Sequence, residues 1–233
     1  MTSSEMAGPE QQPEGVDVAR LYRERFDEGE LAFKRRAWEI LCARVFQQYI
    51  DADDTVVDLG AGHGEFINAI HCGTKIAVDL NPDVRFHVRQ AKVIVADSTD
   101  MRELQDASVD VVFSSNFFEH LPGKRAVIDT LHECRRILRP DGTLILLQPN
   151  IRYLAGRYWD FFDHHTPLTD RSMAEALRLT GFDPERIVPR FLPYTVKDSR
   201  FGRSVALLRL YLRMPVMWRL FGRQMLIVAR PQR

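Results

Sequence analysis

The stretch VVDLGAGHGEF, residues Val56–Phe66, places three glycines at alternate positions directly after an apolar, β-branched run. A strand is predicted before the glycines and a helix after them, so backbone N–H groups and a helix N-terminus face whatever binds there. A dinucleotide-binding loop would read GxGxxG, but its third glycine is replaced by Glu65. Asp58, two residues before the glycines, adds a carboxylate that disfavours a pyrophosphate and suits an ammonium group.

Outward from this stretch, short β-branched runs alternate with helical patterns. The predicted strands are TVVDL, KIAVDL, KVIVAD, VDVVFSS and TLILLQ. This alternation predicts a parallel sheet with helices on both faces. Ligands of such sheets bind at the carboxyl ends of the strands. The polar residues that follow the strands are therefore expected around one crevice; they include Asp58, Asp79, Asp97 and Asn116.

Two of these acids indicate a nucleoside ligand. Asp79 follows the glycines by about twenty residues, where a carboxylate can accept two hydrogen bonds from ribose hydroxyls. Asp97, followed by Ser98, ends the third predicted strand and can accept a hydrogen bond from an exocyclic amine such as that of adenine. A nucleoside whose other end is cationic fits the whole set, and S-adenosylmethionine is such a molecule.

The stretch from about Asp54 to Gln148 resembles the class I S-adenosylmethionine-dependent methyltransferases of type 11. The matching motifs, in order, are VVDLGAGHG, AVDLNP, ADSTDM, SSNFFEHL and LRPDGTLIL. The resemblance implies an α/β, Rossmann-like, doubly wound fold with a mostly parallel seven-stranded sheet, and S-adenosyl-L-methionine as cofactor. It implies cofactor-binding roles for Asp58, Gly60, Ala61, Gly62, Asp79, Leu80, Asp97, Ser98, Asn116 and Phe117.

The chain divides into four predicted parts. Residues 1–18 are expected to be a disordered tail, and residues 19–50 form cover helices, including one near Leu21–Phe26. Residues 51–150 form the cofactor-binding core. Residues 151–233 supply a lid, a substrate-facing segment and an insertion before the last strand, all completing the same domain. With 233 residues and 45% hydrophobic content, one sizeable core is expected.

Three histidines are candidates for a general base, which a methyl acceptor needs when it is an alcohol. His120 follows the fourth predicted strand; His164 and His165 lie in the segment after the fifth. The alternative is that these side chains cap a turn or pack at the surface. His164 and His165, with Asp160 and Asp163, could also hold a metal, but adjacent histidines seldom face one ion, so no metal is predicted.

The acceptor is expected to be a small molecule or a glycan. Aromatic residues are dense in RYWDFFDHH, residues 157–165, and their rings suit sugar faces or planar acceptors, although they could equally pack a lid onto the core. This region also resembles bacterial methyltransferases of glycan and natural-product biosynthesis. Two alternatives stay open: a nucleic acid or protein acceptor, and a non-catalytic cofactor-binding module.

Charge is unevenly distributed along the chain. From Ser199 to the end there are eight Arg and no acid, so the remainder carries minus eight, because the total is zero. That acidic remainder disfavours nucleic acid as a partner. The segment 203–222 combines Arg with apolar residues, so peripheral membrane contact, packing on its own core and a homodimer interface all stay open. No signal peptide or spanning run is evident, and the cytoplasm is the expected compartment.

Overall fold

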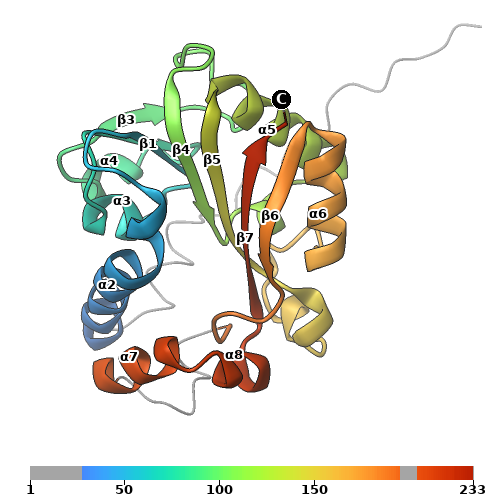
Figure 1. Cartoon of the computed structure of the whole chain (residues 1–233). Helices are drawn as coiled ribbons and strands as arrows, with labels where there is room; N and C mark the ends of the chain where they lie inside the picture. Colours follow the sequence, from blue (N-terminus) through green and yellow to red (C-terminus); the bar gives the residue numbers. More distant parts are fainter. Residues whose placement is uncertain (1–27, 195–203, 233) are drawn as a thin grey trace, which may run out of the picture.

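A seven-stranded mixed sheet forms the centre of the molecule in the computed structural model, which describes residues 28–194 and 204–232 (Figure 1). The strand order is β3-β2-β1-β4-β5-β7-β6. The first five strands in this order are parallel, whereas β7 is antiparallel to both β5 and β6. The predicted doubly wound, mostly parallel sheet is confirmed. The strands are β1 Thr55–Leu59, β2 Thr74–Asp79, β3 Lys92–Val95, β4 Val109–Ser115, β5 Leu138–Pro149, β6 Phe182–Val188 and β7 Gln224–Pro231.

Helices cover both faces of this sheet (Figure 1). One face is covered by α5 and α6, and the other by α2 with α3, α7 and α8. Side chains of β4 alternate between the two cores: Val112 lies in the first, and Val111 and Phe113 lie in the second. The helices are α2 Glu28–Leu41, η1 Cys42–Phe46, η2 Gln47–Tyr49, α3 Glu65–Ala69, α4 Val84–His87, η3 Phe118–His120, α5 Lys124–Ile137, η4 Ile151–Tyr153, η5 Arg157–Asp160, α6 Asp170–Leu179, α7 Val205–Arg213 and α8 Pro215–Phe221.

Some predicted boundaries are wrong. The sequence RPDG, residues 139–142, predicts a turn before the strand TLILLQ, but β5 begins at Leu138 and runs through it. Leu138 pairs with Val109, and a register shift between Val109 and Val111 accommodates the irregularity. The sequence pattern also predicts a strand near Arg186–Leu192, whereas β6 covers Phe182–Val188. The predicted tail 1–18 and the predicted helix near 21–26 lie outside the described residues.

An aromatic cluster attaches the N-terminal helices to the sheet. The rings of Phe66 and Phe113 are stacked with centroids 3.7 Å apart, and Phe46 meets Phe113 edge-on at 4.9 Å. Trp38 of α2 contacts the same three rings. Aromatic pairs add stabilisation beyond the apolar area that they bury. The cluster thus joins α2, the π-helical turn η1 and α3 to strand β4.

Removing the central ring of this cluster should strongly destabilise the protein. Phe113 is fully buried, so Phe113→Ala leaves a cavity and is expected to lower the free energy of unfolding by about 3–5 kcal/mol. Denaturant unfolding followed by tryptophan fluorescence measures the change. The control is Phe86→Ala, because that side chain is 83% exposed and its loss should cost less than about 0.5 kcal/mol. Equal losses for the two variants would contradict the assignment of the cluster.

Candidate functional site

The glycine loop after β1 adopts a backbone that other residues resist. Gly60, Gly62 and Gly64 have φ angles of 70°, 51° and 68°. Because the left-handed region carries no steric cost for glycine, the alternating glycines allow the tight turn from β1 into α3. The N–H groups of Gly60 and Ala61 both donate to the carbonyl of Val78, at 2.9 and 3.2 Å. The loop is thereby held against the end of β2.

Asp79 links the glycine loop to the second strand. Its Oδ2 accepts a hydrogen bond from the Gly62 N–H, and its Oδ1 accepts one from the Asn81 N–H, each at 2.8 Å. Leu80, the next residue, is 59% exposed and presents an apolar surface beside the loop. The predicted ribose acid therefore lies next to the predicted glycine loop, as one nucleoside ligand would require.

The two residues predicted at the adenine end have different environments. Asp97 is exposed, and its Oδ1 accepts hydrogen bonds from the N–H and hydroxyl of Thr99. Ser98 is buried, and its hydroxyl bonds with that of Thr130 on α5 at 2.8 Å. The Ser98 side chain therefore joins the loop after β3 to α5, so only the backbone of Ser98 is left to contact a ligand.

Asp58 lies deeper than predicted. The sequence places its carboxylate at the mouth of the loop, yet the side chain is only 3% exposed. Burial, reinforced by the nearby Glu65 carboxylate, raises the pKa of Asp58 well above its usual range. A cation brought near Asp58 would favour its charged form. The predicted contact with an ammonium group stays a prediction.

The segment after β4 is held by two buried glutamines. Gln148 at the end of β5 accepts a hydrogen bond from the Phe117 N–H at 3.2 Å, and Gln224 at the start of β7 donates to Asn116 Oδ1 at 2.9 Å. Asn116 has a φ of 48°, a conformation that Asn tolerates. Sequence analysis missed both glutamines. The sequence did contain an indication of them, because in TLILLQ and QMLIVAR a single glutamine stands at one end of an otherwise apolar run.

The ring of Phe117 lies directly over the glycine loop. A Cβ built on Gly60 would come within 2.4 Å of the Phe117 ring, whereas one built on Gly62 meets nothing within 4 Å. The loop is therefore covered on one side and open on the other. Exposed backbone beside Asp79, with Asp97 further along the sheet edge, fits a nucleoside that carries a cationic tail.

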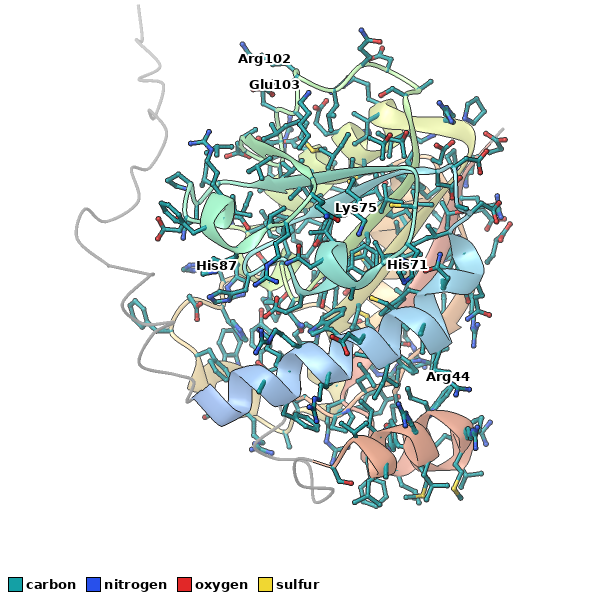
Figure 2. The ribbon with its side chains drawn as sticks, turned by 90° about the vertical axis from the view of Figure 1, so that its left-hand side faces the viewer. Arg44, His71, Lys75, His87, Arg102 and Glu103 are labelled. Carbon is teal, nitrogen blue, oxygen red and sulfur yellow. The ribbon has the colours of Figure 1, made fainter. Side chains whose placement is uncertain are left out.

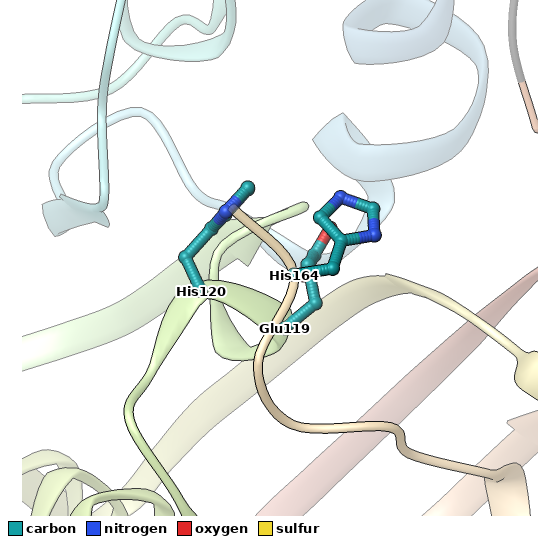
Figure 3. Close-up of side chains that lie close together, drawn as sticks. All are labelled: Glu119, His120 and His164. Atoms are coloured by element: carbon teal, nitrogen blue, oxygen red, sulfur yellow. The ribbon is translucent and has the colours of Figure 1, made fainter. Parts of the chain in front are cut away.

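Beyond the predicted cofactor residues, the structure brings together Glu119, His120 and His164 (Figure 3). Each offers one nitrogen or oxygen ligand atom, and these atoms lie within 4.8 Å of one another. The rings of His120 and His164 are 5.1 Å apart at their centroids. Such a set can exchange protons or coordinate a divalent cation. Of the three predicted histidines, His165 is exposed and lies outside this group.

Backbone hydrogen bonds create that group. The carbonyl of Glu119 accepts from the N–H groups of His165 and Thr166, at 2.8 and 3.0 Å. The Thr166 hydroxyl donates to the Leu121 carbonyl, and the Tyr158 hydroxyl donates to the Thr166 carbonyl, both at 2.6 Å. The segment after β5 is thus fastened across the segment after β4, and the two meeting histidines come from separate segments.

In the aromatic segment 157–165, some side chains pack in the interior and others are exposed to solvent. Tyr158 is buried, and its ring lies 4.6 Å from that of His164, which also stacks on Phe161 at 5.0 Å. Trp159 and Phe162 are instead 58% and 83% exposed. One part of the segment therefore encloses His164, and another presents aromatic surface to solvent.

Comparison with known proteins agrees with this geometry. Residues 57–146 match a family model described as a methyltransferase domain. The chain is 30% identical over 181 residues to a Mycolicibacterium smegmatis protein named probable S-adenosylmethionine-dependent methyltransferase; the match covers 73% of this chain and 68% of that protein. The chain belongs to the S-adenosylmethionine-dependent methyltransferases. The predicted enzyme class and methyl donor are thereby confirmed.

Two further matches bear on fold and acceptor. A Micromonospora griseorubida protein, named provisionally as a 23S rRNA (guanine-N(1)-)-methyltransferase, is 35% identical to this chain over 111 residues. The match covers 44% of this chain and 34% of that protein. A crystal structure of an S-adenosylmethionine-dependent methyltransferase from Archaeoglobus fulgidus superposes with a TM-score of 0.65 at 22% identity. It covers 92% of this chain and 100% of its own, so the methyltransferase fold extends through the C-terminal part.

Gly60→Ala should impair cofactor binding by this methyltransferase. The added methyl group would strain a left-handed backbone and strike the Phe117 ring, so the loop must shift. We expect the dissociation constant for S-adenosylmethionine, measured by isothermal titration, to rise by at least about tenfold, since 1.4 kcal/mol of strain corresponds to that factor. Gly123→Ala is the control because its Cβ meets nothing within 4 Å. Unchanged binding by Gly60→Ala would contradict the role of this loop.

Glu119 should make the stability of the methyltransferase depend on pH. Burial raises its pKa to about 8 from the usual 4.5. The folded state then holds a proton that the unfolded state has lost, so stability is fully present below about pH 4.5 and is lost progressively as pH rises through 8. Relative to Glu119→Gln, which cannot ionise, the wild type should lose about 1–3 kcal/mol between pH 5 and 8.

Urea unfolding in the presence of a chelator measures this difference at each pH. Glu175→Gln, an exposed carboxylate, serves as the control and should follow the wild type throughout. If the free energy of unfolding changes with pH in the same way for Glu119→Gln and the wild type, Glu119 is ionised in the folded protein and the prediction is wrong.

Proposed function

We propose that this methyltransferase transfers the methyl group to a hydroxyl of a small molecule or glycan, with His120 as the general base. The observation that carries the proposal is a partly exposed imidazole beside the post-β4 segment, oriented by Asp163. S-adenosylmethionine supplies a methyl group on a sulfonium centre when it is bound. An alcohol acceptor must lose its proton as the new bond forms, so a base within hydrogen-bond reach is required.

The surroundings of His120 leave one ring nitrogen available as a base. Its Nδ1 lies 2.8 Å from the carbonyl oxygen of Asp163 and 3.5 Å from the Oδ2 of the same residue. A carbonyl only accepts hydrogen bonds, so Nδ1 carries the proton and Nε2 keeps its lone pair. The hydrogen bond from Nδ1 to the Asp163 carbonyl keeps the ring oriented while Nε2 takes the proton of the acceptor hydroxyl.

His164 is better suited to a positioning role. Its Nδ1 lies 2.9 Å from the Tyr158 carbonyl, which fixes the same tautomer, but the residue is only 9% exposed. The His120 side chain is 27% exposed and so is accessible to an acceptor. His164, packed between His120 and the aromatic rings, orients the base and helps exclude water from it.

The exposed aromatics support a sugar or planar acceptor. Trp159 and Phe162 present their rings to solvent on the same segment that carries His164. Aromatic faces pack against the apolar faces of sugars and against planar rings. Such surfaces would hold the acceptor while the protein brings oxygen and methyl carbon to within about 3–3.5 Å.

RNA is the competing acceptor, since the Micromonospora griseorubida relative is named for it. Two observations bear on this alternative. The post-β4 segment reads Ser115-Asn116-Phe117-Phe118 and lacks the prolines that accompany methylation of exocyclic base amines, which argues against those amines but not against the ring nitrogen N1 of guanine. Residues 1–198 carry a formal charge of minus eight, which repels a phosphate backbone.

The acceptor class can be read from the product. Purified protein is incubated with deuterium-labelled donor and, separately, with a hydroxyl-bearing metabolite and glycolipid extract or with total RNA. We expect label in the extract, as a methoxy group by mass spectrometry and NMR. Label in RNA alone, or on nitrogen or carbon, would overturn the proposal.

His120→Asn should remove the base while leaving the cofactor site intact. We expect kcat for the labelled reaction to fall by about 10²–10⁴-fold, with S-adenosylmethionine affinity unchanged. The matched control is His165→Asn, an exposed neighbour of the group, which should keep activity within about twofold. Dialysis against a chelator should leave the wild-type rate unchanged, as expected from a proton-transfer role. Loss of activity on chelation, restored by a divalent metal, would instead assign the three residues to a metal.

A further inference from the structure

A pocket of about 280 Å³ lies between η1, β6 and the helices α7 and α8. Four of the residues that line it are arginines, namely Arg44, Arg186, Arg209 and Arg213. Figure 2 shows Arg44 between the α2–η1 helix and the helices α7 and α8. No acid is among the residues that line the pocket, and residues 204–222 contain none. The pocket therefore concentrates positive charge.

Within the described residues, none of these four arginines pairs with a carboxylate. Arg44, Arg209 and Arg213 make no side-chain hydrogen bond or ion pair within the described ranges, and Arg186 donates to the neutral hydroxyl of Tyr49. Some arginines elsewhere pair with carboxylates, as in Arg136–Glu133, Arg139–Asp110, Arg152–Asp170 and Arg230–Glu185. Like charges held together repel, so an anion in the pocket would be bound favourably.

Apolar side chains are exposed along the same two helices. Eleven large hydrophobic residues are exposed in the described part of the chain, and five of them belong to residues 205–221. Tyr211 and Trp218 point inward, toward Phe191. The five exposed residues are Leu207, Leu210, Met214, Val216 and Leu220. A cationic, amphipathic helix with an exposed apolar side is typical of segments that lie at a membrane surface.

The position of α7 and α8 adds a functional consequence. Figure 1 places them beyond the carboxyl ends of β4 and β5, at the end of the sheet where the candidate site lies. The described part of the chain has no helix long and apolar enough to cross a bilayer. Contact of these helices with a surface would therefore be peripheral, and it would bring the site close to that surface.

We propose that the α7–α8 face, consisting of the four pocket arginines and the five exposed apolar residues, docks on an anionic lipid bilayer. A lipid phosphate enters the arginine pocket, where charge-assisted hydrogen bonds hold it. The exposed Leu, Met and Val side chains insert at the level of the headgroups. Because the pocket arginines are cationic, they favour a bilayer with anionic headgroups over a neutral one. This docking is independent of the acceptor and of the base.

Vesicle sedimentation tests the docking with the full chain. Vesicles of phosphatidylcholine alone are compared with vesicles that contain about one-third phosphatidylglycerol. We expect binding to the anionic vesicles only, weakening as salt rises because the attraction is screened. Arg209→Ala with Arg213→Ala should lower the partition coefficient by about 10- to 30-fold, since each arginine near the surface contributes about three- to fivefold.

Leu210→Glu with Val216→Glu should weaken binding at least as strongly, because charge cannot enter the apolar layer. The matched controls are Arg102→Ala and Leu179→Glu, which alter exposed residues on other elements and should bind like the wild type. Unfolding transitions and S-adenosylmethionine titrations of all variants should be unchanged, which separates this test from that of the proposed function.

Four results would overturn the docking. Equal sedimentation with neutral and anionic vesicles would remove the role of charge, as would wild-type binding by the double arginine variant. Binding of inorganic pyrophosphate without binding of vesicles would assign the pocket to a soluble anion. A concentration-dependent dimer by light scattering, abolished by Leu210→Glu with Val216→Glu and accompanied by no vesicle binding, would assign the face to a second copy of the chain.

Discussion

Burial of the central strands on both faces is the constraint on which the other features depend. The apolar residues of β1, β4 and β5 contact helices on either side, so polar groups are confined to the strand ends. At the carboxyl ends those groups are close enough to bond one another, as Asp79 does with Gly62 and Gln148 with Phe117. The cofactor crevice is therefore a consequence of how the sheet is buried.

A second constraint joins two segments that are distant in sequence. The Glu119 carbonyl accepts hydrogen bonds from His165 and Thr166, and so brings the segment after β5 onto the loop after β4. The same contact buries the Glu119 carboxyl and places His164 beside His120. A buried carboxyl group with a raised pKa, close to a predicted cofactor loop, is a common arrangement at catalytic sites.

The helices α7 and α8 differ from the candidate active site in their charge and in their exposed apolar residues. Several arginines elsewhere pair with carboxylates, whereas those of the arginine pocket pair with none among the described residues. Exposed apolar residues are concentrated on the same helices, α7 and α8. The insertion before the last strand thus has a surface chemistry distinct from the rest of the fold, even though its inner side chains complete one of the two cores.

The sequence by itself determined the fold class and the methyl donor. Local patterns were sufficient, because glycine spacing and the acids after successive strands depend only on strand direction and on which residues end each strand. Tertiary structure decided the depth of Asp58, the bonding of Ser98 to Thr130, and which histidines meet. These depend on contacts between residues far apart in the chain, whose side chains carry no local pattern. The grouping of four arginines from η1, β6 and α7 into one pocket has the same physical reason.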